Sequence, residues 1–265
     1  MASSGKCAEA VTALDRSAQQ NCFIGGGMDY RDLKIEIYAD GADIAKMKQQ
    51  HDEGFVKGFT TNPTLMKKAG VKDYKAFAKE AADAIKDVPL SFEVFADDFP
   101  TMEKEARVLA AFGDNVYVKI PVTNTRGEHS TELIRTLSGD GLKLNVTAVF
   151  TVEQAKEVLE ALDPSSPSIV SIFAGRITNA GVDAEPVISE VSKHCRSHGN
   201  SKVLWASSRE LFNVIQAERA GADIITLTDN LLNSLSTIGK DLYDYSLDTV
   251  KMFYNDGKAL GYRIL

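Results

Sequence analysis

The sequence has few of the features that mark disulfide-rich or membrane proteins. Its three cysteines, Cys7, Cys22 and Cys195, are widely spaced in 265 residues, which predicts neither a disulfide framework nor a metal site. No apolar run is long enough to span a bilayer, and the first thirty residues lack the basic region and apolar core of a secretory signal. We therefore expect a cytoplasmic protein with no membrane partner.

An excess of basic residues is also missing. The chain has 30 Lys and Arg against 37 Asp and Glu, a net charge of -7. Nucleic acids select for clustered Lys and Arg, so we expect no nucleic-acid partner. Any phosphate site must then be local.

Length and composition suit one large domain. A chain that is 44% hydrophobic has enough apolar residues for a single substantial core. Residues 1–33 differ from the rest and contain the run Gly25, Gly26 and Gly27, followed by Met28, which could be an alternative start. We interpret 1–33 as an N-terminal extension, for which disorder is one alternative, and 34–265 as the folded domain.

From Lys34 onward, short β-branched runs alternate with longer amphipathic segments such as 74–86 and 152–162. This pattern is typical of repeated strand-helix units around a parallel sheet. Eight strands are predicted, at Lys34–Asp40, Gly58–Asn62, Pro89–Phe95, Asn115–Val122, Lys143–Phe150, Ser168–Ala174, Lys202–Ser207 and Ala222–Thr228.

Eight such units without a glycine-rich dinucleotide turn favour a closed (β/α)8 TIM barrel, with an open doubly wound sheet as the alternative. The stretch 241–260 is predicted to form an additional C-terminal helix, packed on the barrel or on a neighbouring subunit. We expect a homo-oligomer.

Side chains on a strand alternate between its two faces. On strand 115–122, Val116, Val118 and Ile120 suit the helix layer, which directs Lys119 into the barrel. The same alternation turns Ile35, Ile37, Ala39, Leu144, Val146 and Ala148 outward. It turns mostly polar side chains inward, near the strand ends where barrel enzymes have their active sites. These are Asp40, Thr60, Asn62, Glu93, Asn145, Thr147, Ser171, Phe173 and Ser207.

An inward set with one lysine and two carboxylates, and with no His or Cys, suits imine chemistry, which needs an unprotonated amine and a group that moves protons. Asp40 and Glu93 are candidates for that group. The alternative is that both carboxylates are counter-ions that keep Lys119 charged for structural reasons, and alternation does not decide between these.

Two arginines follow the sixth and seventh strands. Arg176 comes just after strand six, and Ser207 and Arg209 are predicted at the end of strand seven and the start of the next helix. Guanidinium groups beside a helix N-terminus make a good phosphate site, whereas surface salt bridges are the alternative for each arginine alone.

The chain resembles one family, the transaldolases and their small aldolase relatives, over nearly all of 34–265. The resemblance rests on seven motifs in the family's order. They are Ile37-Tyr38-Ala39-Asp40, Thr60-Thr61-Asn62-Pro63-Thr64, Phe92-Glu93-Val94, Val118-Lys119-Ile120-Pro121-Val122-Thr123, Leu144-Asn145-Val146-Thr147, Phe173-Ala174-Gly175-Arg176-Ile177 and Ala206-Ser207-Ser208-Arg209.

The resemblance implies a role for each candidate. Lys119 would form the Schiff base, Asp40 would be the acid-base residue, and Glu93 with Thr147 would hold a proton-relaying water. The remaining candidates would bind substrate. Sugar hydroxyls would meet Asn62, Asn145 and Ser171, the phosphate would meet Arg176, Ser207 and Arg209, and Thr60 and Phe173 would lie near the same ketose.

The implied reaction moves a dihydroxyacetone unit from a ketose phosphate such as fructose 6-phosphate to an aldose phosphate, and needs no cofactor and no metal. Family members that instead release dihydroxyacetone resemble one another in carrying Gln and Tyr where this chain has Glu93 and Phe173, so the resemblance favours transfer. Release, an unusual sugar substrate, and a non-catalytic sugar-phosphate binding barrel remain as alternatives.

For two weaker patterns we expect a structural role and no catalytic or binding function. His194, Cys195 and His198 have no further ligand at metal-binding spacing, and we interpret them as an exposed helix face. The aromatic residues Trp205, Tyr243, Tyr245, Phe253 and Tyr254 are interpreted as core or interface packing.

Overall fold

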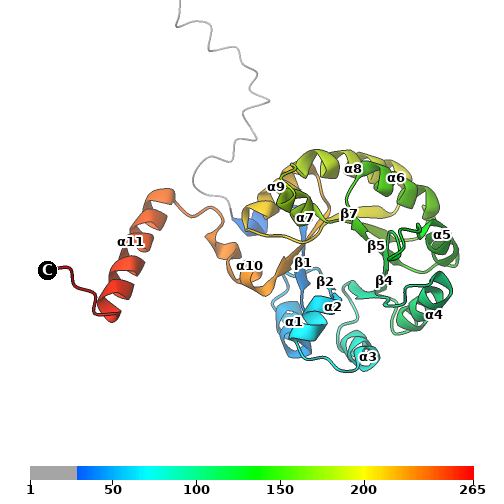
Figure 1. Cartoon of the computed structure of the whole chain (residues 1–265), viewed down its shortest axis with the longest axis horizontal. Coiled ribbons are helices and arrows are strands. Elements are labelled where there is room, and N and C mark those ends of the chain that lie inside the picture. Colours follow the sequence, from blue (N-terminus) through cyan, green and yellow to red (C-terminus); the bar gives the residue numbers. More distant parts are fainter. Residues whose placement is uncertain (1–28) are drawn as a thin grey trace, which may run out of the picture. The chain divides into compact units, whose positions relative to one another are not determined.

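Eight parallel strands close into a ring in residues 29–265, the part of the chain that the computed structural model describes (Figure 1). The strands pair in chain order, and β1 pairs with both β2 and β8, which confirms the barrel and excludes the open sheet. The strands are β1 (Glu36–Asp40), β2 (Gly58–Thr60), β3 (Leu90–Glu93), β4 (Val116–Pro121), β5 (Leu144–Val149), β6 (Ser168–Ile172), β7 (Ser201–Trp205) and β8 (Ile224–Thr228).

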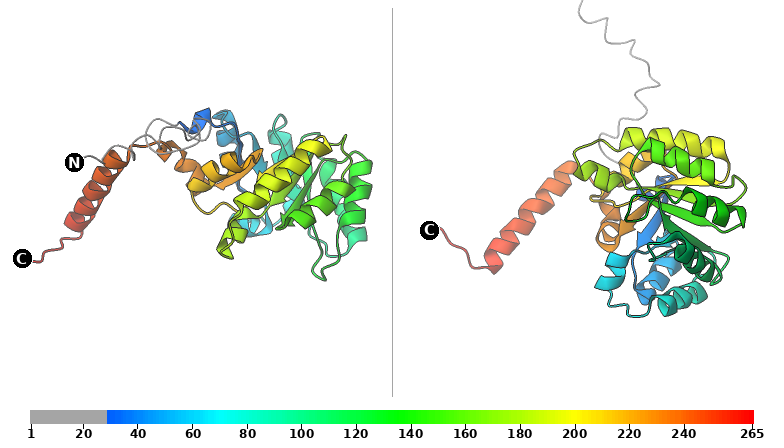
Figure 2. Two further views of the ribbon diagram at one scale, coloured as in Figure 1. Left: turned by 90° about the horizontal axis from the view of Figure 1, so that it is seen from above. Right: turned by 45° about the vertical axis from the view of Figure 1, so that its right-hand side comes forward.

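Helices surround the ring of strands, as the views in Figure 2 show for this part of the chain. Several begin at side chains that suit a helix start. Asp43, Asp73 and Asp98 each accept a backbone hydrogen bond three residues on, and Thr151 forms a reciprocal pair with Gln154. The helices are α1 (Ile44–Asp52), α2 (Pro63–Lys68), α3 (Tyr74–Ala84), α4 (Phe99–Ala110), α5 (Thr131–Gly139), α6 (Val152–Ala161), α7 (Ala174–Asn179), α8 (Glu185–His198), α9 (Phe212–Ala220) and α10 (Asp229–Asn233), with short 3-10 turns at Tyr30–Asp32 and Leu235–Thr237.

Most predicted strands are longer than the observed ones at their carboxyl ends. The third strand ends at Glu93 instead of Phe95, and the sixth ends at Ile172 because Ala174 already begins α7. Glu93 and Phe173 therefore stand at the rim of the barrel, where the chain turns toward the next helix.

The core has two layers, one outside and one inside the ring of strands. Outward-facing Val118, Ile120 and Val146 are completely buried beneath the helices, as alternation predicts. Inside the barrel, an apolar cluster of Tyr38, Ile169, Leu204, Ala206 and Ile224 packs against Tyr117 and Phe173.

A bulge interrupts β5, and the prediction that Ala148 faces outward is wrong for this reason. The β5–β6 register shifts between Val146 and Val149, and Ala148 takes a left-handed conformation with φ 58°. Val149 then takes the fully buried position. A bulge of this kind redirects side chains at the strand end, and it comes directly after Thr147.

The C-terminal residues belong to a different compact unit from Tyr30–Leu235. They form the predicted additional helix, α11 (Leu242–Ala259), in which no residue is buried. Within that unit Tyr243, Tyr245, Phe253 and Tyr254 are all exposed, and their interpretation as core or interface packing stays a prediction. The predicted extension falls, as far as residue 28, outside the described residues, as do Cys7 and Cys22.

Two further residues named in the sequence analysis are buried. Cys195 of α8 is buried, with its thiol pKa raised by burial to about 12, so the interpretation of 194–198 as an exposed face is wrong at that residue. Trp205 is completely buried at the end of β7, as the core alternative predicts for it, and its indole N–H has no hydrogen-bond partner among residues 29–265.

Candidate active site

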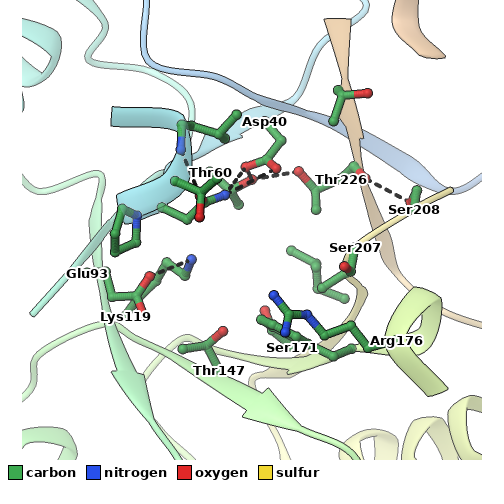
Figure 3. Close-up of a pocket in the computed structure, with 18 of the residues that line it drawn as sticks. Asp40, Thr60, Glu93, Lys119, Thr147, Ser171, Arg176, Ser207, Ser208 and Thr226 are labelled. Atoms are coloured by element: carbon green, nitrogen blue, oxygen red, sulfur yellow. Dashed lines mark hydrogen bonds and ion pairs between the residues drawn. The ribbon is translucent and has the colours of Figure 1, made fainter. Parts of the chain in front are cut away.

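A cavity of about 340 Å³ opens at the carboxyl ends of the strands. All predicted site residues except Asn145 line it, from Asp40 and Thr60 on one side to Arg176 and Arg209 on another. Most of the polar side chains labelled in Figure 3 point into one central space, and they come from several strands and from the segments that follow β6 and β7. The structure thus brings together predicted side chains as far apart in the chain as Asp40 and Arg209, which are 169 positions apart.

Lys119 lines the cavity, with only 6% of the residue exposed. Its Nζ donates to the carbonyl oxygen of Thr61 (2.8 Å) and lies 3.2 Å from Oε2 of Glu93. The two residues are direct neighbours on β4 and β3. The structure therefore pairs the amine with one carboxylate, as the counter-ion alternative supposes for Glu93.

Asp40 ends β1 and accepts hydrogen bonds from uncharged groups. Thr60 Oγ1 donates to its Oδ1 at 3.1 Å, and Asn62 Nδ2 lies 3.4 Å from its Oδ2. Burial is the largest influence and raises the pKa of Asp40 to about 6, against the lowering effect of Lys119 and these hydrogen bonds. A carboxyl group with that pKa exchanges protons readily near neutral pH.

Glu93 is held by a tyrosine that alternation did not single out. Its backbone N–H donates to the hydroxyl of Tyr74 at 2.7 Å, and the ring of Tyr74 packs on Phe95. Burial raises the pKa of the Tyr74 hydroxyl well above its ordinary value, so that group stays neutral and holds the rim end of β3 in place.

Thr147 supplies a buried hydroxyl with no protein partner among the described residues. It lines the cavity and is 2% exposed. Buried polar groups are nearly always hydrogen-bonded in folded proteins. The hydroxyl therefore has bonding capacity left for a water or a substrate in the cavity.

Asn145 does not reach the cavity. It is completely buried, its Nδ2 donates to Ser91 Oγ at 3.0 Å, and its Oδ1 accepts from Ser171 Oγ at 2.6 Å. Ser171 does line the cavity. Asn145 therefore acts on the cavity by orienting the hydroxyl of Ser171.

Arg176 and Arg209 line the opposite wall, and neither guanidinium has a carboxylate partner within residues 29–265. Arg176 lies over the ring of Phe173, 5.5 Å from its centroid. With the Asn179 amide oriented to satisfy both its atoms, Oδ1 accepts from Arg209 Nη2 at 3.2 Å and Nδ2 donates to the carbonyl of Gly175 at 3.0 Å. Two unneutralised guanidinium groups favour an anionic ligand.

Ser207 lines the cavity, although alternation from the observed inward residues of this segment would turn it away. On β7 and just beyond it, Leu204 and Ala206 are the inward residues. Ser207 also lines the cavity because its backbone is left-handed, with φ 66°. The expected helix start at Arg209 is also wrong, since α9 begins at Phe212 and Arg209 lies in the preceding loop.

Thr226 on β8 lines the cavity but was not predicted as a site residue, and the same holds for Thr64, Ser208 and Thr228. Its Oγ1 lies 2.6 Å from Thr60 Oγ1, and both residues are buried. The signal was present in the alternation of Ile224, Thr226 and Thr228, which places two hydroxyls on the inner face next to Asp40.

Two structural findings concern metals and membranes. Residues 29–265 contain no group of three His, Cys, Asp or Glu side chains arranged to hold a metal ion. Over the same residues, no helix combines the length and the apolar character needed to cross a membrane.

Comparison with known proteins finds relatives that match along nearly the whole barrel. Residues 37–264 match the family model described as transaldolase/fructose-6-phosphate aldolase. A "Probable transaldolase" of Methanococcus maripaludis is 38% identical over 202 residues, 76% of this chain and 89% of the relative. A "Probable transaldolase" of a Ruegeria species is 34% identical over 232 residues, 87% of this chain and all of the relative.

A solved structure agrees on the fold. The crystal structure of a protein from Sinorhizobium meliloti in an open loop conformation aligns with a TM-score of 0.51 at 11% identity. The alignment covers 79% of this chain and 55% of that one, so it bears on the fold alone. Sequence match, barrel and cavity agree, and the chain belongs to the transaldolase/fructose-6-phosphate aldolase family of enzymes.

Proposed function

We propose that this chain is a transaldolase that transfers a dihydroxyacetone unit from a ketose phosphate to an aldose phosphate through a Schiff base on Lys119. One observation carries the proposal. A buried amine, 3.2 Å from a carboxylate that can receive its proton, shares a cavity with a second carboxylate and with two arginines that have no carboxylate partner in the described part of the chain.

The ion pair with Glu93 is where the reaction would begin. A protonated amine is not a nucleophile, so Lys119 must lose a proton before it adds to the C2 ketone of the donor. Glu93 is in hydrogen-bond reach of that proton. The carbinolamine then loses water to give an iminium ion, and the free hydroxyl of Thr147 could hold that water.

Asp40 would act in the cleavage step. As Asp40 removes the proton from the C4 hydroxyl, the C3–C4 bond breaks and its electrons move into the iminium, which becomes an enamine. The aldose phosphate leaves. The enamine then attacks the aldehyde of the acceptor, such as erythrose 4-phosphate, Asp40 returns the proton, and hydrolysis frees Lys119.

Arg176 and Arg209, with the hydroxyl of Ser207, would hold the phosphate of both donor and acceptor. Among the described residues, no carboxylate is paired with either guanidinium group, so none has to be displaced on binding. The reacting carbons would then lie between this wall and Lys119, with Asn62, Ser171 and Thr60 left for the sugar hydroxyls.

Borohydride trapping tests the mechanism directly. Reduction in the presence of fructose 6-phosphate should attach a dihydroxyacetone-derived mass to Lys119, located by peptide mass spectrometry. Lys119→Met should lose both adduct and turnover. Lys202→Met, at the amino end of β7, is the matched control and should keep both. Labelling at another lysine, or none, would contradict the proposal.

Release of free dihydroxyacetone is the second candidate, since the matching family model includes fructose-6-phosphate aldolases. Glu93 and Phe173 favour transfer over release by resemblance. The two are separated by measuring turnover of fructose 6-phosphate with and without erythrose 4-phosphate. Turnover that needs the acceptor supports transfer, and equal turnover without it supports release.

A further inference from the structure

Two threonines flank Asp40 from both neighbouring strands. β1 lies between β2 and β8 in the barrel, which places Thr60 on one side of Asp40 and Thr226 on the other strand, opposite Tyr38. Thr60 Oγ1 lies 3.1 Å from Asp40 Oδ1 and 2.6 Å from Thr226 Oγ1. Figure 3 shows the three side chains joined in a row.

The number of available protons determines which group donates in each hydrogen bond of this row. A hydroxyl group has one proton to donate, and an ionised carboxylate only accepts. When Asp40 is ionised, Thr60 must donate to it, so Thr226 must donate to Thr60. When Asp40 is protonated, it can donate to Thr60, and both hydroxyls can then turn without moving any heavy atom.

We propose that Thr226 is a positioning residue that, through Thr60, stabilises the ionised form of Asp40 that accepts the substrate proton. Thr60 and Thr226 are 4% and 6% exposed, so water does not easily replace a lost hydrogen bond, and buried chains of hydrogen bonds strengthen one another. The part of this inference that concerns catalysis rests on the function proposed above.

Besides this hydrogen-bond row, the charges of Lys119 and Asp229 act on the pKa of Asp40. Lys119 on β4 attracts the carboxylate, and Asp229 at the start of α10 repels it. Asp229 is itself paired with Lys46 at 2.8 Å and accepts from Gln50 at 3.1 Å, both on α1. β2 and β8 present only uncharged groups to Asp40, so a substitution at Thr226 changes the hydrogen-bond row without changing any charge.

Thr226→Val and Thr226→Ser form the matched pair, because the first removes the hydroxyl at similar volume and the second keeps it. In Thr226→Val, the acidic limb of the pH profile of kcat should move upward by about 0.5 to 1 unit, the equivalent of one lost hydrogen bond. Turnover should fall about threefold near pH 6 and be unchanged near pH 8. Thr226→Ser should restore the wild-type limb.

Titration of Asp40 itself separates this inference from the proposed function. Carbon-13 NMR of labelled Asp carboxyl groups, assigned with Asp40→Asn, should show the same upward shift in free Thr226→Val. Absence of transaldolase turnover in the wild type would remove the proposed function and leave this comparison intact. Thr226→Ala replaces Thr226→Val if the latter does not fold.

A double-mutant cycle tests the route through Thr60. In a Thr60→Val background the row is already broken, so adding Thr226→Val should move the titration of Asp40 no further. The inference is overturned if Asp40 titrates identically in wild type and Thr226→Val, if Thr226→Ser shifts it as much as Thr226→Val, or if the two substitutions add.

Discussion

The carbonyl oxygen of Ser207 occupies the place where a side chain of residue 175 would begin, since an ideal Cβ on Gly175 would lie 1.7 Å from that oxygen. The backbone N–H of Gly175 also donates to Ala206 at 3.2 Å. The start of α7 and the loop after β7 are therefore in direct backbone contact. This contact brings Arg176 and Arg209 to the same wall of the cavity.

Gly175→Ala should therefore displace the loop that carries Ser207 and Arg209. We expect a loss of about 2 kcal/mol in the free energy of unfolding, together with weaker binding of inorganic phosphate measured by calorimetry. Gly139→Ala is the control, because no atom lies within 4 Å of its ideal Cβ, and it should be neutral or slightly stabilising. Equal stability of the two variants would contradict the account.

Asp40→Asn should stabilise the protein at neutral pH while abolishing turnover. The pKa of Asp40 is raised from 3.8 to about 6 in the folded protein, so the folded state binds this proton more tightly than the unfolded state does. The resulting stabilisation is fully present below pH 3.8 and is lost as pH rises through about 6. Ionised Asp40 therefore costs stability at pH 8, by at most about 3 kcal/mol.

Urea unfolding at two pH values checks this sign. Asp40→Asn should have a higher midpoint than the wild type at pH 8, and the difference should shrink as the pH falls toward 4. A variant that is less stable than the wild type at pH 8 would show that the carboxylate is stabilising in its site.

Asn179→Ala should reduce the preference for phosphorylated substrates. Asn179 holds Nη2 of Arg209 and the carbonyl of Gly175, but it is exposed, so the effect should be modest. We expect KM for fructose 6-phosphate to rise about threefold, with kcat little changed. Unphosphorylated fructose is the control substrate, and an equal change in its kinetics would rule out a role directed at the phosphate.

The pair Glu93→Gln and Phe173→Tyr should increase release of free dihydroxyacetone relative to transfer. The first change removes the ion pair with Lys119 at 3.2 Å, and the second adds a hydroxyl to a ring that lines the cavity. Glu93→Gln alone should lower kcat about a hundredfold if Glu93 moves the lysine proton. The measurement is the ratio of free dihydroxyacetone to transferred product, determined by chromatography. An unchanged ratio in the double variant would show that neither residue controls the choice between release and transfer.

The barrel and most of its cavity could be predicted because both depend on repeated, local patterns. Alternation along β4 places Lys119 inside from Val118 and Ile120 alone, and the closed ring then brings the strand ends together. Asp40, Glu93 and Thr147 follow in the same way. Thr226 was open to the same reasoning, and was missed because a threonine in an apolar strand is also ordinary β-sheet composition.

Features that depend on single backbone angles or on non-local packing could not be predicted. Ala148 and Ser207 both take left-handed conformations that neither residue prefers, so no composition signal marks the bulge or the turn. Asn145 points inward as alternation predicts, but its amide is hydrogen-bonded to Ser171 and Ser91. The burial of Cys195 likewise depends on which face of α8 meets the barrel.

The position of Trp205 gives this protein a built-in optical reporter. Trp205 is the single tryptophan of the sequence, and it is completely buried two residues before Ser207. Fluorescence excited at indole wavelengths therefore arises from one site beside the arginine-bearing loop. Changes in its emission on adding a ligand, or on unfolding the barrel, can be assigned to that site without introducing a dye or removing other fluorophores.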